Sequence, residues 1–181
     1  DENGASLQYR LDFAQNIWKE RPEMSLEPVF SLADEYTGEK IGSKLERIRE
    51  IMKENGCNAH VLSSLDDIAW LLNIRGNDIA YCPLVLSYAI VYNNSVELFA
   101  DIRKFSDDII NLLAENQVKI YPYEDIYRKV SEMTSEDKLL LDSSIMNYSL
   151  YQAISKETVI IDKQNPEILM KSVKNETQAE N

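Results

Sequence analysis

The sequence predicts an α/β fold in which a mixed β-sheet is flanked by helices on both faces. Two apolar segments, residues 84–92 and 96–100, are separated only by Asn93-Asn94-Ser95, and so short a polar turn is typical of an antiparallel hairpin. After the hairpin, helical and strand-like patterns alternate, which is typical of parallel strands joined by helices. A sheet that combines both features contains strands of both directions.

The first 36 residues are predicted to be separate from the main domain. Residues 5–19 carry apolar side chains at helical spacing, which predicts an amphipathic helix. These side chains are Leu7, Leu11, Ala14 and Trp18. Residues 21–36 contain two prolines, which favours an extended linker. We therefore expect residues 1–36 to be the tail helix of a preceding domain and its linker.

The main domain is expected to cover residues 37–174. Its first helix is predicted to run to about Asn55, with Gly56 as its C-terminal cap. Four apolar residues mark one face of that helix, namely Ile41, Leu45, Ile48 and Met52. A short strand is predicted at residues 58–64. The next helix is expected to begin near Ser64.

The remaining elements alternate. Helices are predicted at residues 103–116, 123–133, 144–154 and 165–173, and strands at residues 118–123, 138–142 and 158–162. Pro166 stands in the first turn of the last helix, where proline is tolerated.

The acidic composition argues against nucleic acid as a partner. The chain has 31 acidic and 19 basic residues and a formal net charge of -12, and it lacks a dense basic patch that would bind a polyanion. It contains no apolar run of about 18 residues and no signal-peptide pattern at its start. We therefore expect a cytoplasmic protein with no membrane partner, in which Cys57 and Cys82 remain free thiols.

The common catalytic motifs are missing from the sequence. There is no GxGxxG, GxxxxGK[ST], HExxH or GxSxG. The single histidine, His60, lies in an apolar strand and is interpreted as a buried, hydrogen-bonded core residue. Cys57 is near it in sequence, but no third group is in view to orient such a pair. No catalytic residue and no metal ligand are therefore assigned.

Neighbouring carboxylates occur at three places, where metal or acid–base sites could be proposed. These are Asp66-Asp67, Asp107-Asp108 and Glu124-Asp125. Each pair opens a predicted helix, where negative charge is stabilising by roughly 0.3–1 kcal/mol. We interpret all three as helix N-terminal charges, and the spacing of Ser64 and Asp67 resembles a capping box.

The segment 73–83 is the least usual part of the sequence, because it places Arg75 and Gly76 between two apolar runs. An arginine on a loop could clamp a carboxylate with two hydrogen bonds. The alternative is that Arg75 pairs with Asp78 and braces the loop.

The same segment carries a resemblance to a known family. "DIAWLLNIRGNDIAYCP", together with "IWKERPEMSLEPVF", "YTGEKIGSKLERIREIM" and "MKSVKNETQAEN", resembles the middle region of the three-domain Xaa-Pro aminopeptidases (aminopeptidase P). The resemblance runs in order from Ile17 to Asn181. Cys82 before Pro83 departs from the family pattern, in which a polar residue is expected.

The resemblance implies a creatinase/prolidase N-terminal-like fold for residues 37–174 and a hinge towards a catalytic domain at residues 175–181. In the family, that further domain holds two divalent metals, usually manganese, on two Asp, one His and two Glu. The enzyme removes the N-terminal residue before proline, and the parent is expected to be a homodimer. The metal positions lie beyond this chain, so the chain itself is expected to hold no cofactor and to be inactive alone.

The resemblance also suggests a role for the segment from Asn73 to Pro83. It would be a loop presented to the catalytic domain, the expected partner of this chain, or to a peptide with proline at its second position. Its candidate residues are Asn73, Arg75, Gly76, Asp78, Tyr81 and Pro83. Gly76 is expected to relieve the turn, and Arg75 is expected to face the interface or the substrate.

Two alternatives differ in kind from an accessory domain of an enzyme. The chain could be a stand-alone peptide-binding module without chemistry. It could also be an independent hydrolase built on Cys57 and His60, which would lose activity on thiol alkylation.

Overall fold

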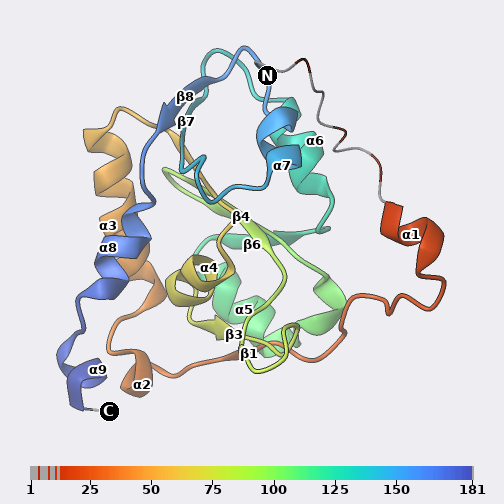
Figure 1. Ribbon diagram of the computed structural model, residues 1–181. Coiled ribbons are helices and arrows are strands. Elements are labelled where there is room, and N and C mark those ends of the chain that lie inside the picture. Colours follow the sequence, from red (N-terminus) through yellow and green to blue (C-terminus); the bar gives the residue numbers. More distant parts are fainter. Residues whose placement is uncertain (1–3, 5–7, 9–10, 12, 181) are drawn as a thin grey trace.

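A mixed sheet forms the centre of the computed structural model, which describes residues 4, 8, 11 and 13–180. In this part of the chain six strands follow the order β6-β5-β4-β2-β7-β8 (Figure 1). They are β2 (Ala59–Leu62), β4 (Tyr88–Tyr92), β5 (Val96–Phe99), β6 (Val118–Tyr121), β7 (Lys138–Leu141) and β8 (Val159–Asp162). β4 is antiparallel to β2 and β5, whereas the other neighbours are parallel. The predicted mixed sheet and its hairpin are confirmed.

Helices cover both faces of the sheet, as predicted. One face packs against α3 (Ile41–Glu54), α4 (Leu65–Leu71), α5 (Asp107–Glu115) and α8 (Pro166–Ser172). The other face packs against α6 (Asp125–Ser131) and α7 (Tyr148–Ala153) (Figure 1). The alternation of β2 shows why both faces are covered, because Ala59 and Val61 enter one core and Leu62 enters the other.

The first main-domain helix, α3, agrees closely with its prediction. Its four predicted apolar residues are all buried. The helix ends at Glu54, and Gly56 follows with a φ of 68°. That left-handed conformation favours glycine, which explains why the helix ends there.

A small second sheet ties the N-terminal linker to the domain. β1 (Phe30–Ser31) pairs antiparallel with β3 (Ile74–Arg75), and a short helix, α2 (Asp34–Thr37), follows it. The extended linker predicted for residues 21–36 was therefore wrong only from Asp34, where α2 begins, because β1 within it is itself extended.

The predicted helix at residues 5–19 was too long. The helix α1 covers Phe13–Ile17, and Gln8 and Leu11 lie outside it, while Leu7 lies outside the described residues. Apolar side chains of this region, such as those of Phe13 and Trp18, are exposed. α1 lies to one side of the sheet (Figure 1), and so short a helix with exposed apolar side chains gains little from tertiary packing.

Other boundaries differ for local reasons. The helix predicted at residues 103–116 is split into a 3-10 turn, η1 (Ile102–Lys104), and α5, because the Ser106 hydroxyl accepts a hydrogen bond from the Ile109 N–H and starts a new helix. The start of α7 is set in the same way by Asn147, which accepts from the Leu150 N–H. The hinge residues 175–181 contain a further helix, α9 (Glu176–Glu180).

The capping-box prediction at Ser64 and Asp67 was wrong. The Ser64 hydroxyl donates to Asp66 at 2.5 Å, whereas the Asp67 side chain is buried and accepts hydrogen bonds from Asn165 and Lys171. Asp67 therefore fastens both ends of α8 to α4, through Asn165 at its N-cap and Lys171 in its last turn, in addition to lying in the first turn of a helix. The other two carboxylate pairs do stand at helix starts, as predicted.

His60 is a buried core residue, as predicted. Its Nδ1 donates to the Leu140 carbonyl at 3.0 Å, and its Nε2 lies 3.2 Å from the Glu167 carboxylate. Burial disfavours the charged imidazolium, but the Glu167 carboxylate, the Leu140 carbonyl and the Asp67 charge together outweigh burial and raise the pKa of His60. This pair holds α8 against β2.

The His60–Glu167 pair predicts a pH-dependent stability. Because the pKa of His60 is higher in the folded protein than its usual 6.5, the pair stabilises fully below that value and loses this contribution as pH rises through the folded-state pKa. Urea unfolding at a series of pH values from about 6.5 upward should therefore show a falling free energy of unfolding. Glu167→Gln should lessen this slope, and an unchanged slope in that variant would contradict the assignment.

Candidate functional site

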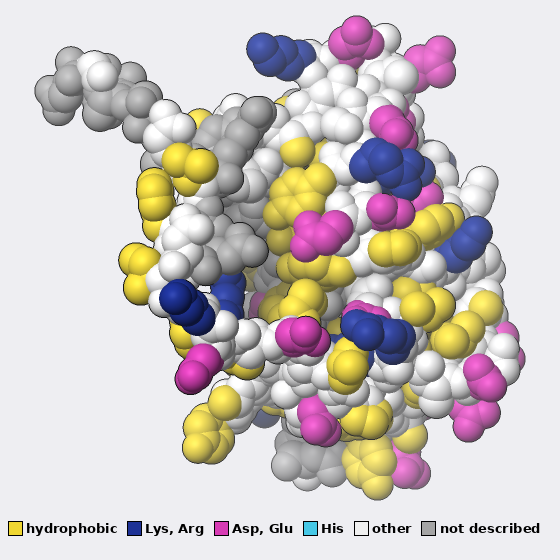
Figure 2. Space-filling model, turned by 90° about the vertical axis from the view of Figure 1, so that its right-hand side faces the viewer, with side chains coloured by type: hydrophobic (Ala, Val, Ile, Leu, Met, Phe, Trp, Pro, Cys, Tyr) yellow, Lys and Arg dark blue, Asp and Glu magenta, His cyan; other side chains and the backbone are white. Residues whose placement is uncertain are grey.

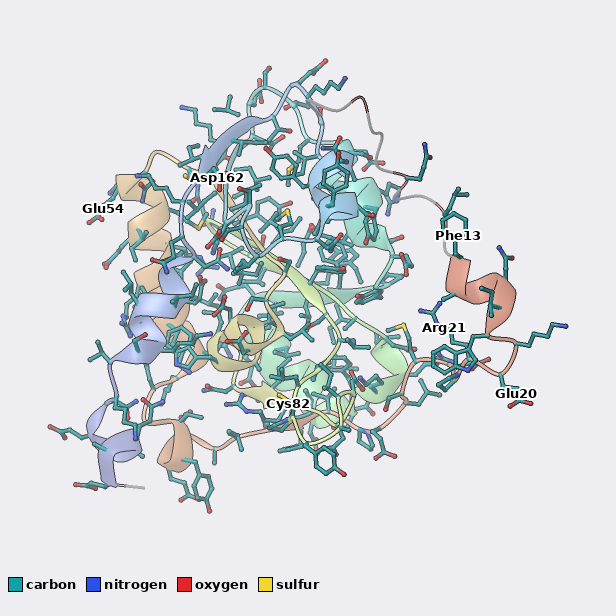
Figure 3. The ribbon with its side chains drawn as sticks, in the orientation of Figure 1. Phe13, Glu20, Arg21, Glu54, Cys82 and Asp162 are labelled. Carbon is teal, nitrogen blue, oxygen red and sulfur yellow. The ribbon has the colours of Figure 1, made fainter. Side chains whose placement is uncertain are left out.

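The segment from Asn73 to Leu86 joins α4 and β3 to β4 and forms a loop with a buried base and an exposed tip. Asn73 is 3% exposed, whereas the residues from Ile79 to Pro83 are all exposed. Cys82 lies in the lower part of the molecule in the view of Figure 3. The sequence prediction of an exposed loop within an apolar region agrees with this arrangement.

The two halves of the loop are held together by backbone hydrogen bonds. The Asp78 N–H donates to the Leu84 carbonyl at 3.2 Å, and the Cys82 N–H donates to the Ile79 carbonyl at 3.1 Å. Tyr81 turns the chain at the tip with a φ of 63°, a conformation that is unfavourable for a bulky side chain. The tip therefore has a defined shape, with a fully exposed tyrosine at its end.

Asn73 organises the base of the loop. Its Oδ1 accepts a hydrogen bond from Lys44 Nζ at 2.6 Å, and its Nδ2 donates to the Glu39 carbonyl at 3.0 Å and to the Thr37 hydroxyl at 3.3 Å. Its φ of 51° lies in the left-handed region that asparagine tolerates well. The base of the loop is thus joined to α3 and to the residues just before it.

Arg75 caps a helix and does not pair with Asp78. Its Nη1 donates to the Ala69 carbonyl at 2.6 Å and to the Ile74 carbonyl at 2.8 Å, while Lys44 Nζ donates to the neighbouring Trp70 carbonyl at 2.7 Å. Two cations thus satisfy carbonyls at the C-terminal end of α4, where positive charge is favourable. The predicted pairing with Asp78 was wrong, although the bracing role itself is present in another form.

Burial changes the acid–base properties of both cations. Desolvation lowers the pKa of Lys44 to about 8, and it also lowers the pKa of Arg75. Lys44 also lies 4.6 Å from the centre of the Trp70 ring. Its hydrogen bonds to Trp70 and Asn73 compensate part of the cost of burying it.

Asp78 is held instead by Lys104, the last residue of η1. Asp78 Oδ2 accepts from Lys104 Nζ and, at 2.7 Å, from the Leu86 N–H. The two side chains are 0% and 3% exposed. The loop is therefore fastened to the segment after β5 by a buried ion pair.

Gly76 serves a purpose different from the predicted one. Its φ is not in the left-handed region, so it does not relieve a turn. A Cβ at this position would lie 2.8 Å from Val85 Cγ2 and 3.2 Å from the Leu84 carbonyl oxygen. Glycine is needed here because the two sides of the loop approach too closely for any side chain.

Gly76→Ala is therefore expected to destabilise the protein by about 1–3 kcal/mol through overpacking. Gly42→Ala is the matched control, because its Cβ would meet only Asn116 Oδ1 at an ordinary 3.5 Å, and alanine in a helix should stabilise by about 1 kcal/mol or less. Urea unfolding of both variants measures the difference. Equal free energies of unfolding for the two variants would contradict the close approach of Val85 to Gly76.

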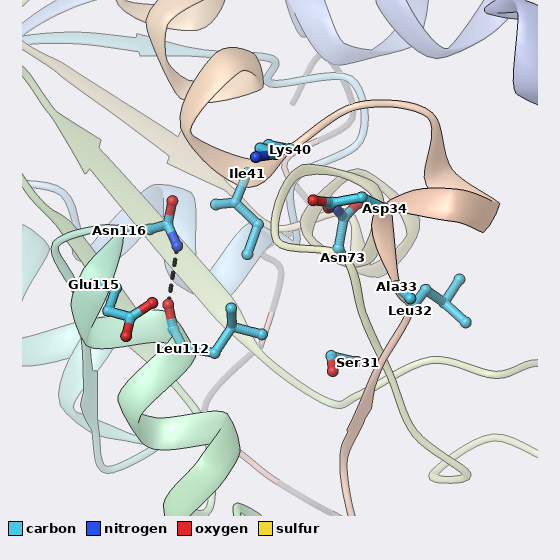
Figure 4. A pocket seen from close by; sticks show the side chains of 10 residues that line it. All are labelled: Ser31, Leu32, Ala33, Asp34, Lys40, Ile41, Asn73, Leu112, Glu115 and Asn116. Atoms are coloured by element: carbon cyan, nitrogen blue, oxygen red, sulfur yellow. Dashed lines mark hydrogen bonds between the residues drawn. The ribbon is translucent and has the colours of Figure 1, made fainter.

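An open cavity of about 380 Å³ lies beside the loop base (Figure 4). The cavity is lined by residues of the loop base, of α2, of the start of α3 and of the end of α5. These include Asn73, Asp34, Lys40, Ile41, Glu115 and Asn116. Asn116 Nδ2 donates to the Leu112 carbonyl at 2.9 Å, so its amide closes the end of α5. The lining carries charges of both signs. Among the described residues that line it, no nucleophile is hydrogen-bonded to a base.

The described residues provide little for catalysis. None of them form a group of three or more His, Cys, Asp and Glu side chains that could hold a metal ion. His60 has both ring nitrogens engaged by Leu140 and Glu167, and the buried Cys57 thiol contacts the Asn55 carbonyl at 3.7 Å. The geometry therefore gives no support to a hydrolase built on Cys57 and His60. Cys57 and Cys82 are both free thiols, as predicted.

The face seen in Figure 2 carries acidic, basic and apolar side chains. Figure 2 shows the basic side chains of one face scattered singly among acidic ones rather than gathered into a patch. Among the described helices, none is both long and apolar enough to span a membrane.

Comparison with known proteins decides the family. The profile described as the creatinase/prolidase N-terminal domain matches residues 20–178. The chain belongs to this family. Xaa-Pro aminopeptidase 1 of Dictyostelium discoideum is 34% identical over 178 residues and 98% of this chain, and the probable Xaa-Pro aminopeptidase P of Sordaria macrospora is 37% identical over 174 residues and 91% of it.

A solved structure extends the likeness to three dimensions. The X-prolyl aminopeptidase from Caenorhabditis elegans, described as a cytosolic enzyme with a di-nuclear active site, matches 93% of this creatinase/prolidase N-terminal domain at 30% identity, with a TM-score of 0.83. The predicted fold class and the resemblance to Xaa-Pro aminopeptidases are therefore confirmed. The chain spans about 28% of the length of each of these three relatives.

The six predicted loop residues lie in two different parts of the loop. Asn73, Arg75, Gly76 and Asp78 build its base, whereas Tyr81 and Pro83 belong to its exposed tip. Sequence reasoning missed Lys44 and Lys104. Lys44 could have been found, because it lies three residues after Ile41 and one before Leu45, on the buried face of α3; Lys104 left no such signal.

Proposed function

We propose that this chain is a non-catalytic domain of a two-metal Xaa-Pro aminopeptidase, an enzyme that removes the N-terminal residue before proline. The observation that carries the proposal is its 34–37% identity, over nearly its whole length, to proteins named Xaa-Pro aminopeptidase of which it spans only about 28%. The chemistry is assigned to the remainder of the protein.

Two divalent metals, most simply Mn²⁺, are proposed for that remainder. The di-nuclear site named for the Caenorhabditis elegans relative supports this part of the proposal. The residues described for this chain do not form a metal-binding group, so no step of peptide hydrolysis is assigned to them. A cytoplasmic, homodimeric parent is proposed on the same family likeness.

The proposed task of the chain is to pack on the catalytic domain of the same polypeptide and to narrow access to its cleft. The loop supports this role, because its base is buried and hydrogen-bonded while its tip exposes Ile79, Tyr81 and Pro83. A preordered apolar tip loses little conformational freedom when it is covered by another surface. Residues 37–174 form the proposed domain, with residues 1–36 before it and the hinge 175–181 after it.

The activity of the whole protein tests the proposal. The full-length protein should cleave tripeptides with proline in second position when Mn²⁺ is present, and it should lose this activity on chelation. The present chain, purified alone, should be inactive. A stand-alone chain that binds such peptides, from a gene without a metallopeptidase region, would instead support the peptide-binding module.

Arg75→Ala in the full-length enzyme tests whether Arg75 faces the substrate. A substrate-facing Arg75 predicts a KM raised by about three- to tenfold, which equals roughly 0.7–1.4 kcal/mol, with kcat little changed. Arg128→Ala is the control, because the Arg128 side chain is 62% exposed and pairs with Asp125 on α6, which packs on the other face of the sheet. Unchanged kcat and KM in Arg75→Ala would leave Arg75 only its capping role at α4.

A further inference from the structure

We propose that Lys104 is a positioning residue, which fixes the direction of the loop tip through its buried ion pair with Asp78 and thereby sets the enzyme's affinity for its peptide. The effect on the peptide rests on the proposed function. The ion pair itself rests on the geometry of this chain alone.

The Asp78 end of the pair depends strongly on Lys104. Asp78 Oδ2 accepts from both Lys104 Nζ and the Leu86 N–H. Asp78 Oδ1 is buried and has no hydrogen-bond partner among the described residues. A buried carboxylate with one unsatisfied oxygen requires the neighbouring cation, because an unpaired buried charge is strongly unfavourable.

The Lys104 end is attached to a rigid part of the fold. η1 is separated from the end of β5 by two residues, and its N-cap Asp101 accepts from the Arg103 N–H at 3.1 Å. The Lys104 N–H donates to the Asp101 carbonyl at 3.1 Å, and the Lys104 carbonyl accepts from the Val29 N–H at 2.9 Å. Lys104 therefore fixes the loop at Asp78 relative to η1 and β5.

The tip depends on this attachment because it carries backbone strain. Tyr81 keeps a φ of 63° although its ring is fully exposed and gains no packing in return. Such a conformation persists only when the surrounding structure imposes it. The stem on either side of the tip is closed at Asp78, whose N–H bonds to Leu84 and whose carboxylate bonds to Leu86 and Lys104.

An ion pair suits the task of orientation better than an apolar contact would. Apolar residues of similar volume can replace a buried pair with little loss of stability. They lack the directional requirement of a charged hydrogen bond. Removing both charges should therefore restore stability but not the direction of the tip.

The test uses three variants of the full-length enzyme. Lys104→Met leaves Asp78 unpaired, and the double variant Asp78→Asn with Lys104→Met removes both charges. Lys129→Met is the matched control, because Lys129 pairs with Glu97 of β5 at 2.9 Å from a partly exposed position away from the loop. The measurements are Tm, steady-state kinetics and hydrogen exchange of the Asp78, Cys82 and Leu86 amides, which donate to the Leu84 carbonyl, the Ile79 carbonyl and the Asp78 carboxylate.

Lys104→Met should lower Tm, speed exchange of the three amides at least tenfold and raise KM about tenfold with kcat within about threefold. The double variant should recover Tm but keep the raised KM and the fast exchange, while Lys129→Met should match the wild type in KM. Recovery of KM together with Tm in the double variant would reduce the pair to a purely structural contact and overturn the proposal. Unchanged exchange in Lys104→Met would overturn it as well.

The two proposals fail in different ways. A wild-type protein without Xaa-Pro activity overturns the proposed function and with it the effect on KM. Whether the ion pair orders the loop is then decided by the hydrogen-exchange rates, which do not depend on activity.

Discussion

The antiparallel pairing of β2 with β4 is the constraint on which the rest of the structure depends. β7 and β8 extend the sheet from β2, and β5 and β6 extend it from β4. Because Leu62 at the end of β2 lies opposite Ala89 near the start of β4, the connecting residues 63–87 leave and return at the same end of the sheet. That connection contains α4, β3 and the loop, so the central pairing decides where the loop is displayed.

Buried polar contacts hold the connection between β2 and β4 in one orientation. Lys44 and Arg75 occupy carbonyls at the end of α4, and Lys104 holds Asp78 beyond β3. Apolar packing is largely indifferent to rotation, whereas charged hydrogen bonds require one geometry. The cost of burying these charges is consistent with a segment whose orientation matters more than its contribution to stability.

The loop base and the C-terminal segment share an anchor. Asn73 Nδ2 donates to the Thr37 hydroxyl, and Asn175 Nδ2 donates to the Thr37 carbonyl at 2.8 Å. α2, which ends at Thr37, therefore lies between the loop and α9. In the proposed enzyme, the segment that leads towards the catalytic domain and the loop that faces it would be held by one residue.

The sequence by itself determined the class of the fold and most of its elements. Three features were predicted from local or periodic signals and are present in the structure, namely the Asn93-Asn94-Ser95 turn, the apolar face of α3 and the burial of His60. Such signals are readable in the sequence because apolar burial and turn chemistry act over a few residues. The loop was also recognised as a unit, from glycine and charge within an apolar region.

Only the tertiary structure decided which side chains meet. Asp78 pairs with Lys104, twenty-six positions away, and His60 meets Glu167, since strand order and helix placement bring these groups together. Gly76 is required by the approach of Val85 across the loop, which no spacing along the chain reveals. Long-range polar contacts depend on where the sheet places distant segments, and a single sequence carries no local record of that placement.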